Sequence, residues 1–118
     1  MSTGKQSHTF NAIGHFDVAG PDLEQLGHFY SSVFGWQVDV KGPGYALLKT
    51  PEGSPGGALL DADAPSLTIG IVVSDLDKAL QIAAGAGGKI VMPKTDNGWV
   101  KKAQVSDPAG NCVTVIQG

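Results

Sequence analysis

The chain carries the stretch GHFDVAGPDLEQLGHFYSSVFGWQVDV at residues 14–40, and SLTIGIVVSDLDKALQIAAGAGGKIVM at residues 66–92 follows the same pattern. Each reads as an apolar strand, a turn, a helix with an acidic start, a glycine and a second strand. Asp22-Leu23-Glu24 in the first stretch matches Asp75-Leu76-Asp77 in the second. Such a repeat predicts two similar modules, each too small to bury a sheet face by itself.

The spacing of apolar residues predicts ten elements of secondary structure. Asp22 and Asp75 are expected to cap two helices, which end at Gly35 and near Ala86. Strands are predicted at 12–19, 36–40, 45–49, 57–60, 67–73, 89–92, 99–105 and 111–116. The order β-α-β-β-β, found twice, predicts an α+β domain with modules at 11–61 and 66–118, joined by the polar link Asp61 to Pro65. Residues 1–10 are expected to form a loose arm.

Composition and charge narrow the classes of partner. The chain has 118 residues, of which 42% are apolar and 16% charged, as in a packed globular protein. A net charge of −3 without a basic run argues against nucleic acid, and no apolar run approaches the ~20 residues of a membrane span. Cys112 is the single cysteine, which excludes an internal disulfide. A cytoplasmic location is the expectation.

Several motifs are distributed along the chain in a way that resembles a known family. They are His15-Phe16-Asp17-Val18, Val33-Phe34-Gly35-Trp36, Val73-Ser74-Asp75-Leu76-Asp77-Lys78-Ala79 and Asp107-Pro108-Ala109-Gly110-Asn111. With these motifs the chain resembles the vicinal oxygen chelate superfamily, which includes glyoxalase I, bleomycin-resistance proteins and extradiol dioxygenases. The resemblance implies two βαβββ modules that form an open eight-stranded cup. In enzymes of the family, the floor of the cup holds a divalent metal that acts as a Lewis acid.

The resemblance also identifies where the metal ligands would fall in this sequence. The positions are His15, Thr68, Thr114 and one near Ala58 or Leu60. One imidazole and two hydroxyls are a poor set, because catalytic sites usually have three protein ligands and threonine is a weak donor to transition metals. No metal or other cofactor is therefore expected, although a weak site formed by His15 and Asp17 remains an alternative.

The candidate ligand-binding residues combine the resemblance with the pattern of the strands. Asp17 follows His15 by two residues, so both side chains share a face of the strand. The carboxylate is expected to pair with His15, or with Lys101 or Lys102. The full candidate set is His15, Asp17, Tyr45, Ala58, Thr68, Trp99, Lys101 and Thr114. No catalytic residue is assigned.

Four functions remain open. The first is a bleomycin-resistance-like protein that binds a small organic molecule without a catalytic metal. The second is a metal-dependent lyase, isomerase or dioxygenase with an unusual ligand set around His15. The third is a metal-free enzyme in which His15 and Asp17 act as a general acid–base pair. The fourth is a structural or partner-binding module. Exposed sheet edges also predict a homodimer.

Overall fold

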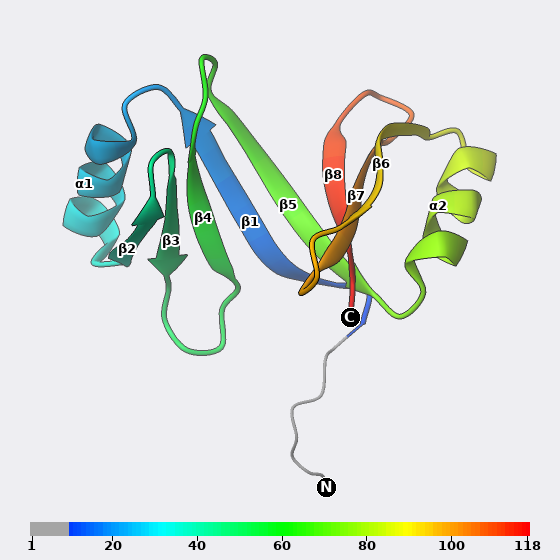
Figure 1. Cartoon of the computed structure of the whole chain (residues 1–118), viewed down its shortest axis with the longest axis horizontal. Coiled ribbons are helices and arrows are strands. Elements are labelled where there is room, and N and C mark those ends of the chain that lie inside the picture. Colours follow the sequence, from blue (N-terminus) through cyan, green and yellow to red (C-terminus); the bar gives the residue numbers. More distant parts are fainter. Residues whose placement is uncertain (1–9) are drawn as a thin grey trace, which may run out of the picture. The chain divides into compact units, whose positions relative to one another are not determined.

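The computed structural model describes residues 10–118 (Figure 1). Within them the chain forms eight strands and two helices, in the order β-α-β-β-β twice. The bounds are β1 Ala12–Gly20, α1 Leu23–Phe34, β2 Gln37–Gly42, β3 Tyr45–Lys49, β4 Gly56–Asp61, β5 Ser66–Val73, α2 Leu76–Gly85, β6 Lys89–Asp96, β7 Lys101–Ser106 and β8 Cys112–Gln117. The predicted α+β class and element order are confirmed. Apart from Phe10, the predicted arm and His8 lie outside the described residues.

The chain divides into two compact units. The first unit spans residues 14–69, and the second spans residues 70–118 together with residues 10–13. In the first unit the strands are ordered β2-β3-β4-β1, and in the second they are ordered β5-β8-β7-β6. In each unit one pair is parallel, β1 with β4 and β5 with β8, and the other pairs are antiparallel. In both units, therefore, the three strands that follow the helix are joined by antiparallel pairing and lie on one side of the unit's first strand.

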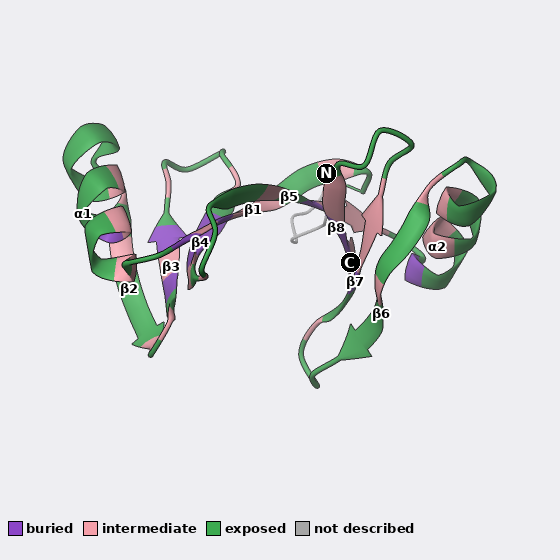
Figure 2. Ribbon diagram, turned by 90° about the horizontal axis from the view of Figure 1, so that it is seen from above, coloured by how far each residue is buried: buried purple, intermediate pink, exposed green. Residues whose placement is uncertain are grey.

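Helix α1 covers one face of the first unit's strands (Figure 1). The buried core residues beneath it are Val18, Ala46, Leu48 and Leu59, and Figure 2 shows the burial concentrated on β3, β4 and the inner side of α1. Strand residues alternate between the two faces of a sheet, so the neighbours of these core residues point away from α1. This alternation determines which side chains are left for a site on the opposite face.

The ends of α1 follow the sequence prediction. Asp22 adopts a left-handed conformation with φ 63°, and its side chain accepts a hydrogen bond from the Gln25 backbone N–H. Gly35 has φ 73° and closes the helix through a hydrogen bond to the Ser31 carbonyl. A positive φ at Gly35 carries no Cβ penalty. The predicted cap and the predicted stop are both confirmed.

The apolar stripe of α1 is broader than the surface it buries. Phe29, Val33 and Phe34 are each more than half exposed, although helical spacing predicts them on the core side. The helix instead approaches the sheet at Gly27, where an added Cβ would lie 3.4 Å from a methyl of Val38. This close approach turns Phe29 and Val33 to the edge of the contact. Helical spacing alone predicts Phe34 in the core, and this prediction is wrong, since Phe34 is 55% exposed.

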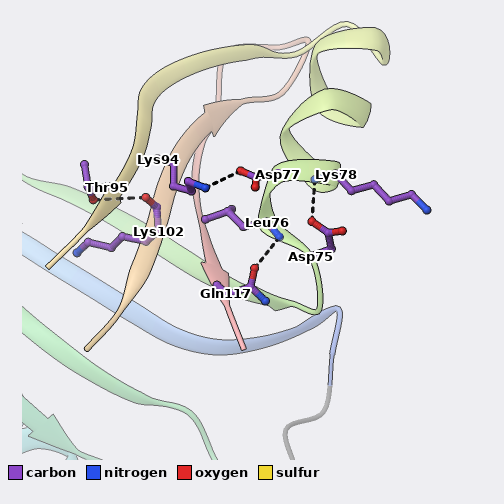
Figure 3. A network of polar contacts seen from close by, with 8 residues as sticks. All are labelled: Asp75, Leu76, Asp77, Lys78, Lys94, Thr95, Lys102 and Gln117. Atoms are coloured by element: carbon purple, nitrogen blue, oxygen red, sulfur yellow. Dashed lines mark hydrogen bonds and ion pairs between the residues drawn. The ribbon is translucent and has the colours of Figure 1, made fainter. Parts of the chain in front are cut away.

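The second unit is built on the same plan with smaller side chains. Helix α2 packs Leu76 against Ala103 and Val115, which are buried. Asp75 caps this helix as predicted, accepting a hydrogen bond from the Lys78 N–H at 3.1 Å (Figure 3). Helical spacing predicts Ile82 on the inward side of this helix, which is wrong, since Ile82 is 60% exposed. Neither helix in residues 10–118 is long and apolar enough to cross a membrane.

Strand β6 is longer than the sequence predicts. It runs from Lys89 to Asp96 and includes Pro93, which the prediction placed after the strand. An edge strand tolerates proline because one side of its backbone has no partner strand. The register of β6 on β7 shifts on both sides of Met92, so the strand continues past the proline with irregular pairing.

Candidate functional site

His15 and Asp17 form a hydrogen-bonded pair on β1. The His15 Nε2 atom lies 2.9 Å from Asp17 Oδ1, and the side chains are 33% and 22% exposed. Of the partners considered for Asp17 in the sequence, the structure therefore selects His15. A half-buried imidazole held by a carboxylate is oriented by it, which suits a role in binding or proton transfer.

The position of this pair follows from the packing of its neighbours. Phe16 and Val18 turn towards α1, where the Phe16 ring lies 5.7 Å from the Trp36 ring, centroid to centroid. The alternation of β1 then directs His15 and Asp17 to the opposite side. We call this side the dyad face; it carries His15, Asp17, Gln37, Asp39, Tyr45, Leu47, Lys49, Gly56, Ala58 and Leu60. The core therefore positions the pair without contacting it.

A hollow of about 950 Å³ lies on the dyad face. Its lining includes His15, Gln37, Leu47, Lys49 and Gly56, together with residues of the loop between β3 and β4. Its volume is within the range of pockets that bind small molecules. All of its lining residues belong to the first unit.

Some charged side chains around the hollow form ion pairs, and others do not. Lys41 lies 2.9 Å from Asp39, and the hydrogen bond and negative charge of Asp39 raise the pKa of Lys41 above its usual value of 10.5. Asp17 is occupied by His15. Lys49 and Glu52 also line the hollow, and neither forms an ion pair within the described part of the chain. A ligand would therefore meet one unpaired cation and one unpaired carboxylate.

Two further candidates lie on the same face. Ala58 is the register partner of Asp17 and is 1% exposed. Tyr45 lies opposite Leu60 and is 40% exposed. Ala58 is thus covered, the Tyr45 side chain is accessible, and neither residue lines the hollow.

Thr68 and Thr114 differ in how their side chains are placed. Thr68, on β5 in the first unit, is half-buried. Thr114, on β8 in the second unit, is 4% exposed, and its hydroxyl accepts a hydrogen bond from Gln104 Nε2 at 3.3 Å. The Thr114 hydroxyl thus has a partner within the second unit.

Trp99 and the two lysines after it belong to the hairpin between β6 and β7. Trp99 is 88% exposed. Its backbone N–H donates to Asn97 Oδ1 at 3.2 Å, so the turn is ordered while the ring projects into solvent. Lys101 shares a face with Ala103, beneath α2, whereas Lys102 shares the other face with Gln104. Figure 3 shows the Lys102 carbonyl accepting a hydrogen bond from Thr95.

The residues at the metal positions implied by the resemblance do not fit a divalent ion. His15 is engaged by Asp17, the Thr114 hydroxyl by Gln104, and Ala58 has no donor atom. Within residues 10–118, no three histidine, cysteine, aspartate or glutamate side chains gather in one place. Zinc and similar ions require three protein ligands of better donor strength. We therefore derive no chemistry through a metal.

Of the eight candidate residues, His15 alone lines the hollow, and the other residues of its lining, Gln37, Lys49 and Gly56 among them, were outside the candidate set. Gln37 and Lys49 were not considered. For the Gly56-Gly57 pair, the sequence left open the close approach of a ligand, with strand bending as the simpler interpretation. Lys49 could have been identified from the sequence, because it lies four residues after the candidate Tyr45 on a predicted strand and therefore shares its face. The sequence alone did not show that β4 lies between β3, which carries Lys49, and β1, which carries His15.

The chain belongs to the glyoxalase/bleomycin resistance protein/dioxygenase superfamily, whose model matches residues 12–115. No protein of curated function matches it in sequence. Methylmalonyl-CoA epimerase from Mycobacterium tuberculosis is similar in structure, with a TM-score of 0.68 and 17% identity, over 95% of this chain and 92% of the epimerase.

Two larger proteins contain a similar domain. The Mn(II)-bound glyoxalase from Novosphingobium aromaticivorans gives a TM-score of 0.71 at 19% identity, over 92% of this chain and 39% of the glyoxalase. An extradiol ring-cleaving dioxygenase from B. fuscum gives 0.72 at 19% identity, over 89% of this chain and 32% of the dioxygenase. At this level of identity the likeness establishes the fold. The chain spans about two fifths and one third of these two proteins.

Proposed function

We propose that this protein binds a small organic molecule on the dyad face of its first unit, without a catalytic metal. The observation that carries the proposal is the half-buried His15–Asp17 pair beside a hollow of about 950 Å³. Leu47 and Pro51 supply apolar lining, and polar groups surround them. Ligand sites commonly combine an apolar wall with a few polar groups that orient the ligand.

The metal-free part of the proposal rests on donor chemistry. The family-type positions offer one imidazole, already hydrogen-bonded, in place of a full ligand set. Elemental analysis of purified protein is expected to find no stoichiometric transition metal. Turnover of methylglyoxal with glutathione is expected to stay at background when nickel or zinc is added. A stoichiometric ion that the His15→Ala variant loses would contradict the proposal.

Binding is tested by recording amide NMR spectra of the protein with a fragment library. Fragments that bind are expected to shift the resonances of Leu47 and Gly56. His15→Ala is expected to weaken these fragments about five- to thirtyfold, the loss of one or two hydrogen bonds. His28→Ala is the matched control, because His28 lies exposed on α1, outside the lining of the hollow, and shares a hydrogen bond with Ser32 at 3.5 Å. Equal weakening by both variants would contradict the assignment of the site.

A second candidate function uses the same pair as a metal-free general acid–base. The 2.9 Å contact between His15 and Asp17 favours it, because a carboxylate that orients an imidazole is a recurring device in proton transfer. The test is deuterium incorporation next to a carbonyl group, with the hemithioacetal of methylglyoxal and glutathione in heavy water containing a chelator. Exchange that requires both His15 and Asp17 would favour this function over simple binding.

A further inference from the structure

Gly56 leaves a gap in the row of side chains on the dyad face. It is the register partner of His15 on β1, and the pairing of Leu48 with Gly57 places Lys49 of β3 on its other side. A Cβ built at Gly56 would meet only the Leu48 carbonyl oxygen, at 3.7 Å, which is ordinary contact. Apart from the residues next to it in the chain, no other atom lies within 4 Å of that Cβ.

The size of this gap suits one small functional group. Neighbouring strands lie 4.7–4.9 Å apart, so two strand spacings separate the Cα atoms of His15 and Lys49 by about 10 Å. One side chain is missing between them. We call this space the Gly56 slot; its walls are His15 and Lys49, and its floor is the backbone of β4. It opens into the hollow, which the same three residues line.

Lys49 supplies one unpaired positive charge beside the slot. Asp17 and Asp39 are occupied by His15 and Lys41, each at 2.9 Å. Lys49 has no ion-pair partner among the described residues, and Glu52, on the same rim, lies outside ion-pair distance of it. A lysine ammonium is a compact point charge with three donors and binds carboxylate or phosphate readily. The space left by the missing side chain of Gly56 is small, and among these anions a carboxylate has the size that fits it.

We propose that the Gly56 slot takes the carboxylate of a small organic acid, with Lys49 as its counter-charge and its hydrocarbon part against Leu47 and Pro51. This inference rests on the function proposed above and names the ligand class of that site. His15 forms the opposite wall of the slot, and Asp17, which accepts a hydrogen bond from its Nε2–H, holds the imidazole in place.

The test compares acids with their uncharged amides. NMR titrations use benzoate against benzamide and succinate against succinamide, since each pair has the same shape and differs in charge. The acids are expected to bind about tenfold tighter than the amides, the effect of one charged hydrogen bond. Lys49→Gln is expected to remove this preference. Lys78→Gln, which removes an exposed lysine of the second unit, is expected to preserve it.

Two further variants test the slot and its charge separately. Gly56→Val fills the slot and is expected to abolish binding of the acids while the protein stays folded, because the position has room for a Cβ. Glu52→Gln removes a like charge from the rim and is expected to tighten the acids. Thermal melting of each variant verifies that it is folded.

The outcomes separate the two proposals. If amides bind as tightly as acids, or if Lys49→Gln keeps the preference for acids, the carboxylate inference fails and the proposed binding function stands. If neither acids, amides nor the neutral fragments of the library shift any resonance of the dyad face, both proposals fail. Acids that bind in wild-type protein and in Lys78→Gln, but not in Gly56→Val, support both.

Discussion

Gly56 and Gly57 are neighbours on β4 with opposite surroundings. Gly57 is buried on the α1 side, and a Cβ there would overlap the ring of Phe16. Gly56 faces the hollow, and a Cβ there would meet one carbonyl oxygen at 3.7 Å. One glycine is therefore required by the core, and the other leaves space for the site.

We expect Gly57→Ala to lower the free energy of unfolding by about 1–3 kcal/mol, because Phe16 must move away from Trp36 to make room. Gly56→Ala is the matched control, expected to change it by less than about 1 kcal/mol. Urea denaturation of the two variants measures the difference. Equal stabilities would show that Phe16 has space to relax.

Asp107 organises the turn between β7 and β8. Its carboxylate accepts hydrogen bonds from the N–H groups of Ala109 and Asn111 and from the Asn111 side chain, each at 2.9 Å. The Asn111 contacts hold the pKa of Asp107 below its usual value of 3.8. A carboxyl whose pKa is lowered on folding stabilises the folded state above its unfolded pKa, and the contribution disappears as the pH falls through the folded pKa.

Replacement of Asp107 is therefore expected to act in a pH-dependent way. Asp107→Ala should lower the melting temperature at about pH 6, and the difference from wild type should shrink as the pH falls below about 4, where the native carboxylate becomes protonated. Melting curves across this range provide the measurement. A difference that is constant with pH would indicate that the charged form contributes nothing.

Helix α2 is attached to the second unit through its first turn. The Gln117 Oε1 atom accepts a hydrogen bond from the Leu76 backbone N–H at 2.9 Å (Figure 3). Its Nε2 donates to the Ser74 carbonyl at 2.7 Å. Leu76 is 1% exposed. The last residues of β8 thus satisfy backbone groups at the point where β5 leads into α2.

Gln117→Ala is expected to lower the free energy of unfolding by about 1–3 kcal/mol, because it leaves a buried N–H without a partner. The exposed Gln81, on the same helix, provides the control, and Gln81→Ala should stay within about 0.5 kcal/mol of wild type. Amide hydrogen exchange should also show faster opening of α2 in Gln117→Ala. Unchanged protection of the Leu76 amide from hydrogen exchange would show that the hydrogen bond from Gln117 does not stabilise the start of α2.

The two outer strands differ in their suitability for pairing with another chain. Strand β6 contains Pro93 and shifts its register twice against β7. Strand β2 keeps a regular register with β3 from Gln37 to Val40 and exposes 69% of Val40. Proline and irregular pairing protect an edge from association, and β2 has less of this protection.

The homodimer predicted from the sequence is accordingly proposed to form through β2. Light scattering is expected to give about twice the mass of the chain. Val40→Lys, which places a charge on this edge, should shift the protein towards monomer. A monomer in the wild-type protein at working concentration would refute the prediction, and a dimer unaffected by Val40→Lys would place the contact elsewhere.

Membership of the superfamily does not by itself assign a reaction. Its members of similar structure include an epimerase, a glyoxalase and a dioxygenase, all below 20% identity to this chain. Function is determined by the groups at the site and not by the fold. For this protein, the groups at the family-type positions direct the proposal towards binding.

The sequence by itself determined the local structure. Helical spacing, the caps at Asp22 and Asp75 and the turn at Asp107 all depend on neighbours within a few residues, so the duplicated β-α-β-β-β order was predicted correctly. The alternation of β1 also placed His15 and Asp17 on one face. The exposure of Phe29 and Phe34 was not predictable, because it depends on where Gly27 lets α1 approach the sheet.

Only the tertiary structure decided how the strands share the site. The parallel pairing of β1 with β4 brings Gly56 beside His15, and the antiparallel pairing of β3 places Lys49 on its other side. Lys49 and Gly56 lie 34 and 41 positions after His15 in the sequence, and no pattern within a few residues specifies which strand pairs with β1. Packing of Phe16 over Gly57 selects this register, because only glycine leaves room for the ring.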